Sequence, residues 1–333
     1  MHRRISLKSL GLLVSVAVAV PALLGMSHGS ISDRDLTIAV IPKGTTHEFW
    51  KSIHAGAVKA SQKDGTQIIW KGPAREDARA DQIKVVEDFI TRGVDGIVIA
   101  PLDDIALVGP LKEAAGEDIP IVVIDSGVRW DGYVSFVATD NYQGGVLAAN
   151  EMGRLLGGKG RVVVLRYVVG SASTSKRENG FLETIKKSWP GITVVSSNQY
   201  GGATPESCLA AAENLLNKYN DIDGVFAPCE PVSVAFMQSL KTTSRKSNVK
   251  LVGFDASEVL VSGLKSGAID ALVVQDPMAM GEKGVDAVVA HIQGKKVEKF
   301  IDTGCHVVTK ANMKEPEINR LLNPPLKKYL GDG

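Results

Sequence analysis

Cysteine is scarce in this chain of 333 residues, which has only Cys208, Cys229 and Cys305. Three widely spaced cysteines are too few for a disulfide scaffold or a zinc cluster. Net charge is nearly absent as well, because 38 Lys and Arg residues face 37 Asp and Glu residues, which leaves +1. Nucleic-acid-binding proteins usually carry a basic excess or stripe, so the composition predicts no nucleic-acid partner.

Several enzyme motifs are also missing from the sequence. There is no Gly-x-x-x-x-Gly-Lys-Ser/Thr phosphate loop, no Gly-x-Gly-x-x-Gly after the first predicted strand and no Gly-x-Ser-x-Gly nucleophile turn. No set of nucleophile, base and orienting group can be assembled, and we predict no catalytic residue, metal or cofactor. Binding is therefore favoured over catalysis. A secreted α/β hydrolase is kept as an alternative, because catalytic triads assemble in space rather than along the sequence.

Long apolar runs are absent beyond residue 30, but the N-terminus has a short one. Arg3, Arg4 and Lys8 precede an uncharged run at Leu10–Leu24, and Ser27-His28-Gly29 provides small residues for cleavage after Gly29. This pattern predicts a removable signal peptide over residues 1–29. The alternative is a membrane anchor, but the run is shorter than the ~20 residues that span a bilayer. We expect an exported, soluble protein without stable membrane insertion, using either the general or the twin-arginine route.

Short apolar runs alternate with amphipathic helices along the chain. In the first part, strands are predicted at Leu36–Pro42, Thr66–Trp70, Gly96–Ala100 and Ile119–Ile124, with helices at Glu48–Lys63 and Ala80–Arg92. The pattern then restarts, with strands predicted at Arg161–Leu165, Ile192–Ser196, Val225–Ala227 and Lys250–Gly253, and helices at Lys176–Ser188, Pro205–Tyr219 and Val232–Lys241. Such alternation is typical of parallel sheets that are covered on both faces.

The two halves carry matching residues at the ends of their strands. Asp125 ends one apolar run and Asp255 ends the corresponding run in the second half, while Pro101 and Pro228 end the preceding strands. Ligands of open α/β sheets bind at the carboxyl ends of the strands. We therefore predict two similar α/β domains that face each other across a ligand-binding cleft.

A series of local motifs carries a resemblance to a known family. The series is Ile38-Ala39-Val40-Ile41-Pro42, Phe49-Trp50, Val94-Asp95-Gly96-Ile97-Val98-Ile99-Ala100-Pro101, Ile119-Pro120-Ile121-Val122-Val123-Ile124-Asp125, Asp140-Asn141-Tyr142-Gln143-Gly144-Gly145, Gly170-Ser171-Ala172-Ser173, Arg177-Glu178-Asn179-Gly180-Phe181, Leu251-Val252-Gly253-Phe254-Asp255 and Gln275-Asp276-Pro277. In this order and spacing it resembles the periplasmic sugar-binding proteins of ABC transporters, of the ribose-binding type. The resemblance covers roughly Leu36 to Thr309.

The resemblance implies two lobes joined by three crossing strands, as in type I periplasmic binding proteins. The N-terminal lobe would comprise residues 36–138 plus 276–304, and the C-terminal lobe residues 139–275 plus 305–325. It further implies a monomeric periplasmic receptor that binds a small neutral sugar or polyol and delivers it to an ABC permease. The alternative is a sensor of a sugar or of an autoinducer-2-like ligand that signals to a membrane kinase or chemoreceptor.

The resemblance also implies which residues bind the ligand. Phe49 and Trp50 match aromatic residues that sandwich a sugar ring, Asp125 and Asp255 match sugar-binding carboxylates, and Gln275 matches an amide. The remaining members of the expected set are Lys43, His47, Ser126, Ser175, Arg177, Tyr200 and Cys229. Each acid could instead cap the following helix, which is the role expected of Asp103. Arg177 could pair with Glu178 at the surface, and Cys229 could be a small buried side chain.

Departures from the ribose-type pattern indicate a different sugar. Ser126 and Ser175 stand where ribose-type members have arginine, so two guanidinium groups are missing from the pocket. Lys43, His47 and Arg177 could supply other donors. Ile41-Pro42-Lys43 resembles the subgroup that binds rhamnose or autoinducer-2, although the Asp-Gln pair of that subgroup is absent. We therefore expect ribose not to be the preferred ligand.

Overall fold

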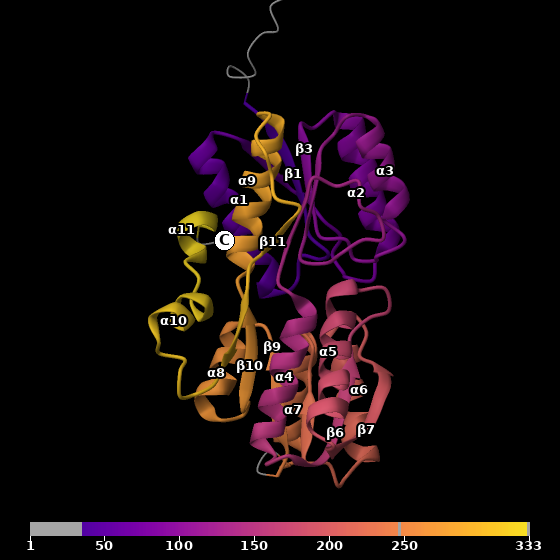
Figure 1. Cartoon of the computed structure of the whole chain (residues 1–333), viewed down its shortest axis with the longest axis vertical. Coiled ribbons are helices and arrows are strands. Elements are labelled where there is room, and N and C mark those ends of the chain that lie inside the picture. Colours follow the sequence, from indigo (N-terminus) through magenta and orange to yellow (C-terminus); the bar gives the residue numbers. More distant parts are fainter. Residues whose placement is uncertain (1–34, 246–247, 332–333) are drawn as a thin grey trace, which may run out of the picture. The chain divides into compact units, whose positions relative to one another are not determined.

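The computed structural model describes residues 35–245 and 248–331, and the predicted signal peptide lies outside these ranges. The described residues form two six-stranded sheets (Figure 1). The first has the order β11-β5-β4-β3-β1-β2 and is formed by β1 (Thr37–Ile41), β2 (Gln67–Trp70), β3 (Gly96–Ile99), β4 (Ile121–Ile124), β5 (Ser135–Ala138) and β11 (Phe300–Asp302). All of its strand pairs are parallel.

The second sheet repeats the strand order of the first. Its order is β12-β10-β9-β8-β6-β7, formed by β6 (Lys159–Arg166), β7 (Gly191–Tyr200), β8 (Gly224–Phe226), β9 (Lys250–Phe254), β10 (Ala271–Gln275) and β12 (Cys305–Val308). Only the edge strand β12 is antiparallel to its neighbour among the described pairs. The prediction of two doubly wound α/β lobes is confirmed, although β7 extends further than the predicted strand.

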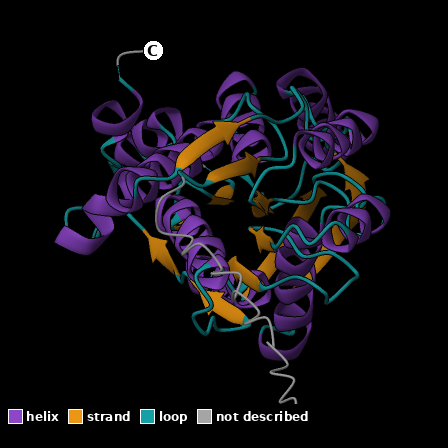
Figure 2. Ribbon diagram, turned by 90° about the horizontal axis from the view of Figure 1, so that it is seen from above, coloured by secondary structure: helices purple, strands orange, loops and turns teal. Residues whose placement is uncertain are grey.

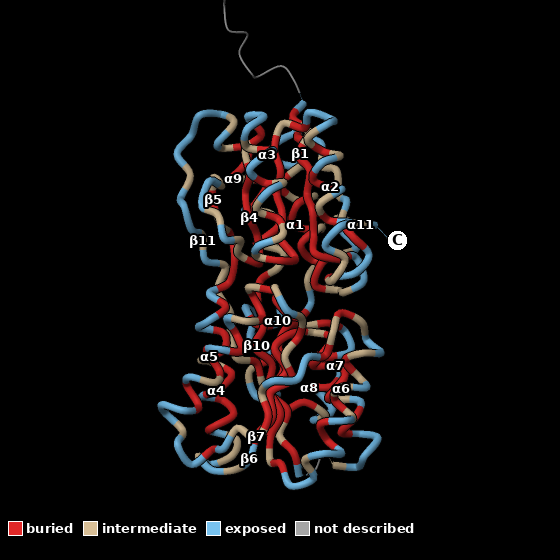
Figure 3. The backbone as a smooth tube through the Cα atoms, turned by 90° about the vertical axis from the view of Figure 1, so that its right-hand side faces the viewer, coloured by how far each residue is buried: buried red, intermediate tan, exposed pale blue. Residues whose placement is uncertain are grey.

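Helices cover both faces of each sheet, and Figure 2 shows strands enclosed by helices when the molecule is seen from above. In the first lobe, α1 (Glu48–Asp64) and α9 (Pro277–Ile292) cover one face, while α2 (Arg79–Arg92) and α3 (Val108–Gly116) cover the other. In the second lobe, α4 (Asn141–Leu155) and α5 (Ala172–Ser188) lie opposite α6 (Pro205–Lys218), α7 (Glu230–Thr242) and α8 (Glu258–Ser266). The central strands between these layers are buried, whereas the edge strands β2, β7, β11 and β12 are partly exposed (Figure 3). We use "lobe" for one sheet with its covering helices.

Each lobe contains a helix that follows the fifth strand of the other sheet. α4 follows β5 but packs against α5, and α9 follows β10 but packs against α1. Both α4 and α9 approach their partner helix closely at a glycine. A Cβ atom on Gly145 would lie 2.0 Å from the carbonyl oxygen of Arg177, and one on Gly281 would lie 2.0 Å from that of Ile53. No side chain fits at these two contacts.

The chain passes between the two lobes at four places. The first three lie between β5 and α4, between β10 and α9, and between β11 and β12. Then α10 (Pro316–Leu322) packs against β10, whereas α11 (Leu326–Leu330) packs against α1 in the other lobe (Figure 1). Arg320 Nη1 pairs with Asp276 Oδ2 at 2.9 Å beside the second crossing. The C-terminal segment therefore returns to the first lobe.

Candidate functional site

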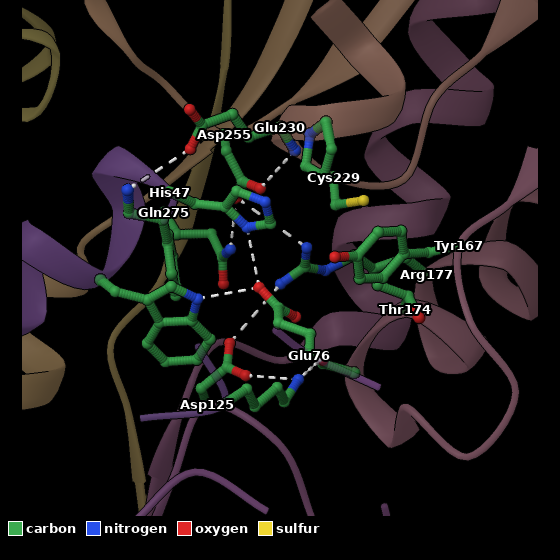
Figure 4. A pocket seen from close by; sticks show the side chains of 15 residues that line it. His47, Glu76, Asp125, Tyr167, Thr174, Arg177, Cys229, Glu230, Asp255 and Gln275 are labelled. Atoms are coloured by element: carbon green, nitrogen blue, oxygen red, sulfur yellow. Dashed lines mark hydrogen bonds and ion pairs between the residues drawn. The ribbon is translucent and has the colours of Figure 1, made fainter. Parts of the chain in front are cut away.

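The ends of the strands from both sheets enclose a buried pocket (Figure 4). Nine of the twelve predicted residues line it: Lys43, His47, Phe49, Trp50, Asp125, Arg177, Cys229, Asp255 and Gln275. The lining also includes Glu76, Tyr167, Ser173, Thr174, Glu230 and Pro231, which the sequence analysis did not single out. The centre of a water molecule can occupy about 30 Å³ of this pocket. Ligand pockets usually measure roughly 300–1,000 Å³, so in this arrangement of the lobes the pocket is too small to hold a sugar.

The two strand-end acids occupy equivalent and unusual backbone positions. Asp125 follows β4 with a φ of 57°, and Asp255 follows β9 with a φ of 73°. The backbone N–H of each donates to the neighbouring strand, to Val137 O at 3.1 Å and to Val273 O at 2.8 Å. Left-handed backbone is uncommon outside glycine and tends to cluster at functional sites. The repeated conformation aims both carboxylates into the same pocket.

Asp125 is held by a buried ammonium group. Lys43 Nζ lies 2.8 Å from Asp125 Oδ2, and both side chains are at most 4% exposed. Lys43 also donates to Ser173 Oγ of the second lobe at 2.9 Å. The following helix α4 is capped by Asp140 rather than by Asp125. The capping alternative therefore does not describe Asp125.

Asp255 is held mainly by neutral donors. Its Oδ1 accepts from Gln275 Nε2 at 2.6 Å, and its Oδ2 accepts from the backbone N–H of Glu230 at 2.9 Å. Asp255 thus does cap a helix, but this is α7, whereas Ser257 caps the helix that follows. Burial raises the pKa of Asp255 above its ordinary value, although Arg177 and Gln275 oppose that shift.

Arg177 lies between the two acids. Its Nη2 is 4.0 Å from Asp125 Oδ1, and its Nη1 is 3.9 Å from Asp255 Oδ1. Its Nε donates to Asn141 Oδ1 at 2.7 Å, and the guanidinium lies 4.0 Å from the centre of the Phe254 ring. The side chain is 3% exposed. The alternative of a surface pair with Glu178 is wrong, because Glu178 pairs with Arg166 at 2.8 Å.

A second set of titratable side chains lies around the aromatic rings of Phe49 and Trp50. Phe49 and Trp50 pack edge to face with their ring centres 5.1 Å apart. Glu76 Oε1 accepts from Trp50 Nε1 and faces His47 Nδ1, both at 2.8 Å. Glu230 Oε2 lies 3.4 Å from the backbone N–H of Phe49, and burial raises the pKa of Glu230 to about 7. Acidic residues therefore line both sides of His47.

Three buried polar atoms in this pocket have no hydrogen-bond partner in the described structure: His47 Nε2, Tyr167 Oη and Gln275 Oε1. Buried polar atoms are usually paired. These three are therefore the protein groups best placed to meet polar atoms of a ligand.

Three of the predicted residues lie outside the pocket lining. Ser126 is fully buried, and its Oγ accepts from the backbone N–H of Ser173 at 3.1 Å. Ser175 lies two positions after Ser173 on α5, which turns it away from the face that carries Ser173 and Arg177. Tyr200 is 47% exposed at the end of β7. Cys229 lines the pocket and also packs within the core of the second lobe.

Hydrogen bonds join the lobes around the pocket rim. Glu48 Oε2 accepts from the backbone N–H of Glu258 at 2.9 Å, at the start of α8. On another part of the rim, Arg79 Nη2 donates to Val169 O at 2.7 Å, and Asp104 N donates to Gly170 O at 3.0 Å. Asp103 binds Arg79 and accepts from the backbone N–H groups of Ile105 and Ala106 in the turn before α3, whose N-cap residue is Leu107. The two lobes are thus in direct contact.

The sequence of most of the chain matches a known protein family. A model of the periplasmic binding protein domain matches residues 38–296. The chain belongs to the periplasmic binding protein family. The resemblance read from the sequence motifs is confirmed, and membership implies a periplasmic location. Between residues 35 and 331, leaving out 246 and 247, no helix has the length and apolar character needed to cross a membrane.

Several relatives of this periplasmic binding protein have known names or structures. The ribose import binding protein of Bacillus subtilis is 27% identical over 293 residues, covering 88% of this chain and 93% of that protein. A carbohydrate transporter solute-binding protein of Agrobacterium radiobacter, solved with D-arabinose, is 35% identical with a TM-score of 0.84, covering 87% and 99%. An ABC transporter solute-binding protein of Agrobacterium vitis, solved with D-fucose, is 37% identical with a TM-score of 0.83, covering 86% and 100%.

The described residues hold no group of three or more His, Cys, Asp or Glu side chains arranged for a metal ion. The charged residues of the pocket instead bind one another, as in the Lys43–Asp125 and His47–Glu76 pairs. Such an arrangement presents fixed donors and acceptors to a polar ligand.

Proposed function

We propose that this protein is a periplasmic receptor that binds one small neutral sugar or polyol between its lobes and delivers it to an ABC permease. The observation that carries the proposal is the buried pocket in which Asp125, Asp255 and Arg177 meet beside the Trp50 ring. Carboxylates and guanidinium groups make charge-assisted hydrogen bonds to hydroxyls, and an aromatic face suits the C–H face of a sugar ring. The named relatives are import or transporter proteins, which favours transport over the sensor alternative.

We also propose how the chain is organised and processed. The signal peptide is residues 1–29. The mobile lobes are residues 36–138 plus 276–304 and residues 139–275 plus 305–325, with α11 joining the first lobe. In this proposal the receptor is a monomer that binds one ligand per chain. It has no nucleic-acid partner and does not turn the sugar over. Mass spectrometry of the exported protein tests cleavage after Gly29.

We infer that the ligand contacts come from the nine predicted residues that line the pocket, together with Tyr167 and Ser173. Ser126 acts indirectly in this proposal, by holding Ser173. Ser175 faces away from the pocket on α5, and Tyr200 is exposed at the end of β7. Neither side chain is therefore expected to contact a ligand in this closed arrangement.

Ribose is not expected to be the preferred ligand. Guanidinium groups fix two hydroxyl oxygens at once, and this pocket has only Arg177, which already binds Asn141 and Pro228 O. The test is titration calorimetry of the mature protein with D-arabinose, D-fucose, D-allose, L-rhamnose, D-ribose and myo-inositol. We expect saturable binding of at least one non-ribose member with one site per chain. Absence of binding across the panel at millimolar concentration would contradict the sugar-receptor proposal, and ribose binding tighter than the others would contradict the specificity.

A further inference from the structure

Glu76 lies on the segment between β2 and α2 and connects two pocket residues through one oxygen atom. Its Oε1 is 2.8 Å from Trp50 Nε1 and 2.8 Å from His47 Nδ1. His47 is the N-cap residue of α1 and Trp50 follows three positions later, so both side chains face the same direction. A single carboxylate oxygen thereby binds both the Trp50 indole and the His47 imidazole, and Figure 4 shows Glu76 facing His47.

This contact leaves the imidazole one nitrogen for the ligand. Nδ1 is occupied by Glu76, while Nε2 is buried and has no partner among the described residues. In a neutral ring whose Nδ1 carries the proton, Nε2 is an acceptor, whereas in the charged ring it is a donor. The charge of His47 therefore decides which kind of ligand atom it can bind.

The groups around His47 favour the charged ring. Three carboxylates face it from three different elements: Glu76 before α2, Glu230 at the start of α7 and Asp255 after β9. The nearby cations are engaged elsewhere, since Lys43 pairs with Asp125 and Arg177 lies between Asp125 and Asp255. Burial lowers the pKa of His47, but Glu76, Glu230 and Asp255 together raise it above its ordinary value of 6.5.

His54 on the same helix provides an internal contrast. Its ring stacks on Trp70 with the ring centres 4.5 Å apart. Burial lowers the pKa of His54, and no acidic side chain in the described part of the chain offsets this effect. The two histidines differ because His47 faces a carboxylate and His54 does not.

The pairing also affects the acid. Burial raises the pKa of Glu76, but the bond to His47 and the charges of His47 and Lys43 bring it below its ordinary value.

We propose that Glu76 is a positioning residue that keeps His47 protonated, so that His47 Nε2–H donates to an acceptor oxygen of the bound sugar. This inference rests on the proposed sugar-receptor function. It names the chemistry of one ligand position, which must present an oxygen lone pair, either a ring oxygen or a hydroxyl that donates its own proton elsewhere. Affinity should be full below the pKa of His47 and should fall as the pH rises through it.

The first measurement needs no ligand. The Hε1 resonance of His47 is followed by NMR from pH 5 to 9 and is assigned with His47→Gln. We expect a midpoint above 6.5 in the wild type and a midpoint lowered by about one unit or more in Glu76→Gln, where the buried imidazole loses its anion. Trp50→Phe is the matched control, because it removes the other donor to the same oxygen and should leave the midpoint unchanged.

The second measurement is calorimetry across the same pH range with D-arabinose and D-fucose as probes. At pH 7 we expect Glu76→Gln to bind about tenfold more weakly than wild type, the size of one lost charge-assisted hydrogen bond. At pH 5 the difference should shrink. His47→Gln should flatten the pH profile even if Glu76→Gln folds poorly. Since Glu230 titrates near neutral pH, Glu230→Gln is included and should shift the midpoint less than Glu76→Gln does.

The outcomes separate this inference from the proposed function. If neither probe binds to the wild type, the sugar-receptor proposal fails while the NMR titration still tests the Glu76–His47 pair. If a probe binds but His47 titrates at or below 6.5, or if Glu230→Gln rather than Glu76→Gln controls the midpoint, the positioning role of Glu76 is overturned.

Discussion

The two lobes present the same backbone device to the pocket but hold it with different chemistry. In both, an aspartate in left-handed conformation follows a central strand and donates its N–H to the adjacent strand. In the first lobe, Asp125 is neutralised by the Lys43 ammonium. In the second, Asp255 is bound by the Gln275 amide and a helix N-terminus, with Arg177 at 3.9 Å. Equivalent positions in a repeated fold therefore do not imply equivalent electrostatics.

The difference determines which groups are left without a partner when each aspartate is replaced. A charge paired with a buried cation leaves that cation stranded when it is removed. Removal of Asp255 leaves the neutral donors of Gln275 and Glu230 unpaired, while Arg177 keeps Asp125 as a facing carboxylate, which should be less costly. The asymmetry between Asp125 and Asp255 can be tested directly.

The largest effect is expected at Arg177, which both acids share. Arg177→Met leaves two buried carboxylates without their common cation, so the free energy of unfolding should fall by about 3–5 kcal/mol. Sugar binding should be lost at millimolar concentration. Urea unfolding and calorimetry measure the two effects. Arg79→Met is the control, because its pair with Asp103 is partly exposed and should contribute about 0–1 kcal/mol. Wild-type binding by Arg177→Met would refute the shared role.

Substitution of the two acids separately should reveal their different partners. Asp125→Asn strands the Lys43 ammonium, so we expect a loss of about 3 kcal/mol or more in unfolding free energy. Asp255→Asn should cost about 1–3 kcal/mol. Both should weaken sugar binding, measured by calorimetry. Asp103→Asn, at another strand end but outside the pocket, should affect stability alone. Equal losses from Asp125→Asn and Asp255→Asn would remove the proposed asymmetry.

The close helix contacts offer a second comparison between the lobes. Gly145→Ala and Gly281→Ala each place a methyl group against a backbone carbonyl, and each should destabilise by about 1–3 kcal/mol through overpacking. Only Gly145→Ala pushes on the backbone of Arg177, so only this variant should also weaken sugar binding. Thermal unfolding and calorimetry on both proteins provide the matched pair. A similar loss of affinity in Gly281→Ala would show that the effect is not specific to Arg177.

The smallest effects are expected at two positions that the sequence predicted and the pocket leaves out. Ser175→Ala and Tyr200→Ala should change binding and stability by no more than about 0.5 kcal/mol, as for other surface substitutions. The same calorimetric titrations apply. A tenfold loss at either position would mean that the ligand-bound arrangement differs from this closed one.

Site residues could be predicted from the sequence where they directly follow a buried strand. Asp125 and Asp255 were predicted because each follows a buried strand, and the carboxyl ends of strands meet at one edge of a sheet. Tyr167 directly follows β6 and could have been found by the same rule. Gln275 was predicted from the family resemblance alone. Ser175 was included because it matches a position at which ribose-type members carry arginine, but on α5 Ser173 faces the pocket instead.

Other features depend on contacts that no local pattern records. Glu76 lies in a segment without regular structure, and its role arises only when α1 brings His47 and Trp50 against it. The capping of α7 by Asp255 joins residues 25 positions apart. The return of α11 to the first lobe follows a short helix and two prolines, which indicate a turn but not its destination.

The late edge strands have a consequence for the order in which the protein folds. β1 to β5 are complete by Ala138, but their sixth strand, β11, begins only at Phe300, and the covering helix α9 lies between residues 277 and 292. Closing such a long loop is entropically costly and slows folding. While the chain is being synthesised, the face of the first sheet that α1 covers therefore stays incompletely covered until α9 has emerged. We expect this delay to keep the nascent chain unfolded for longer.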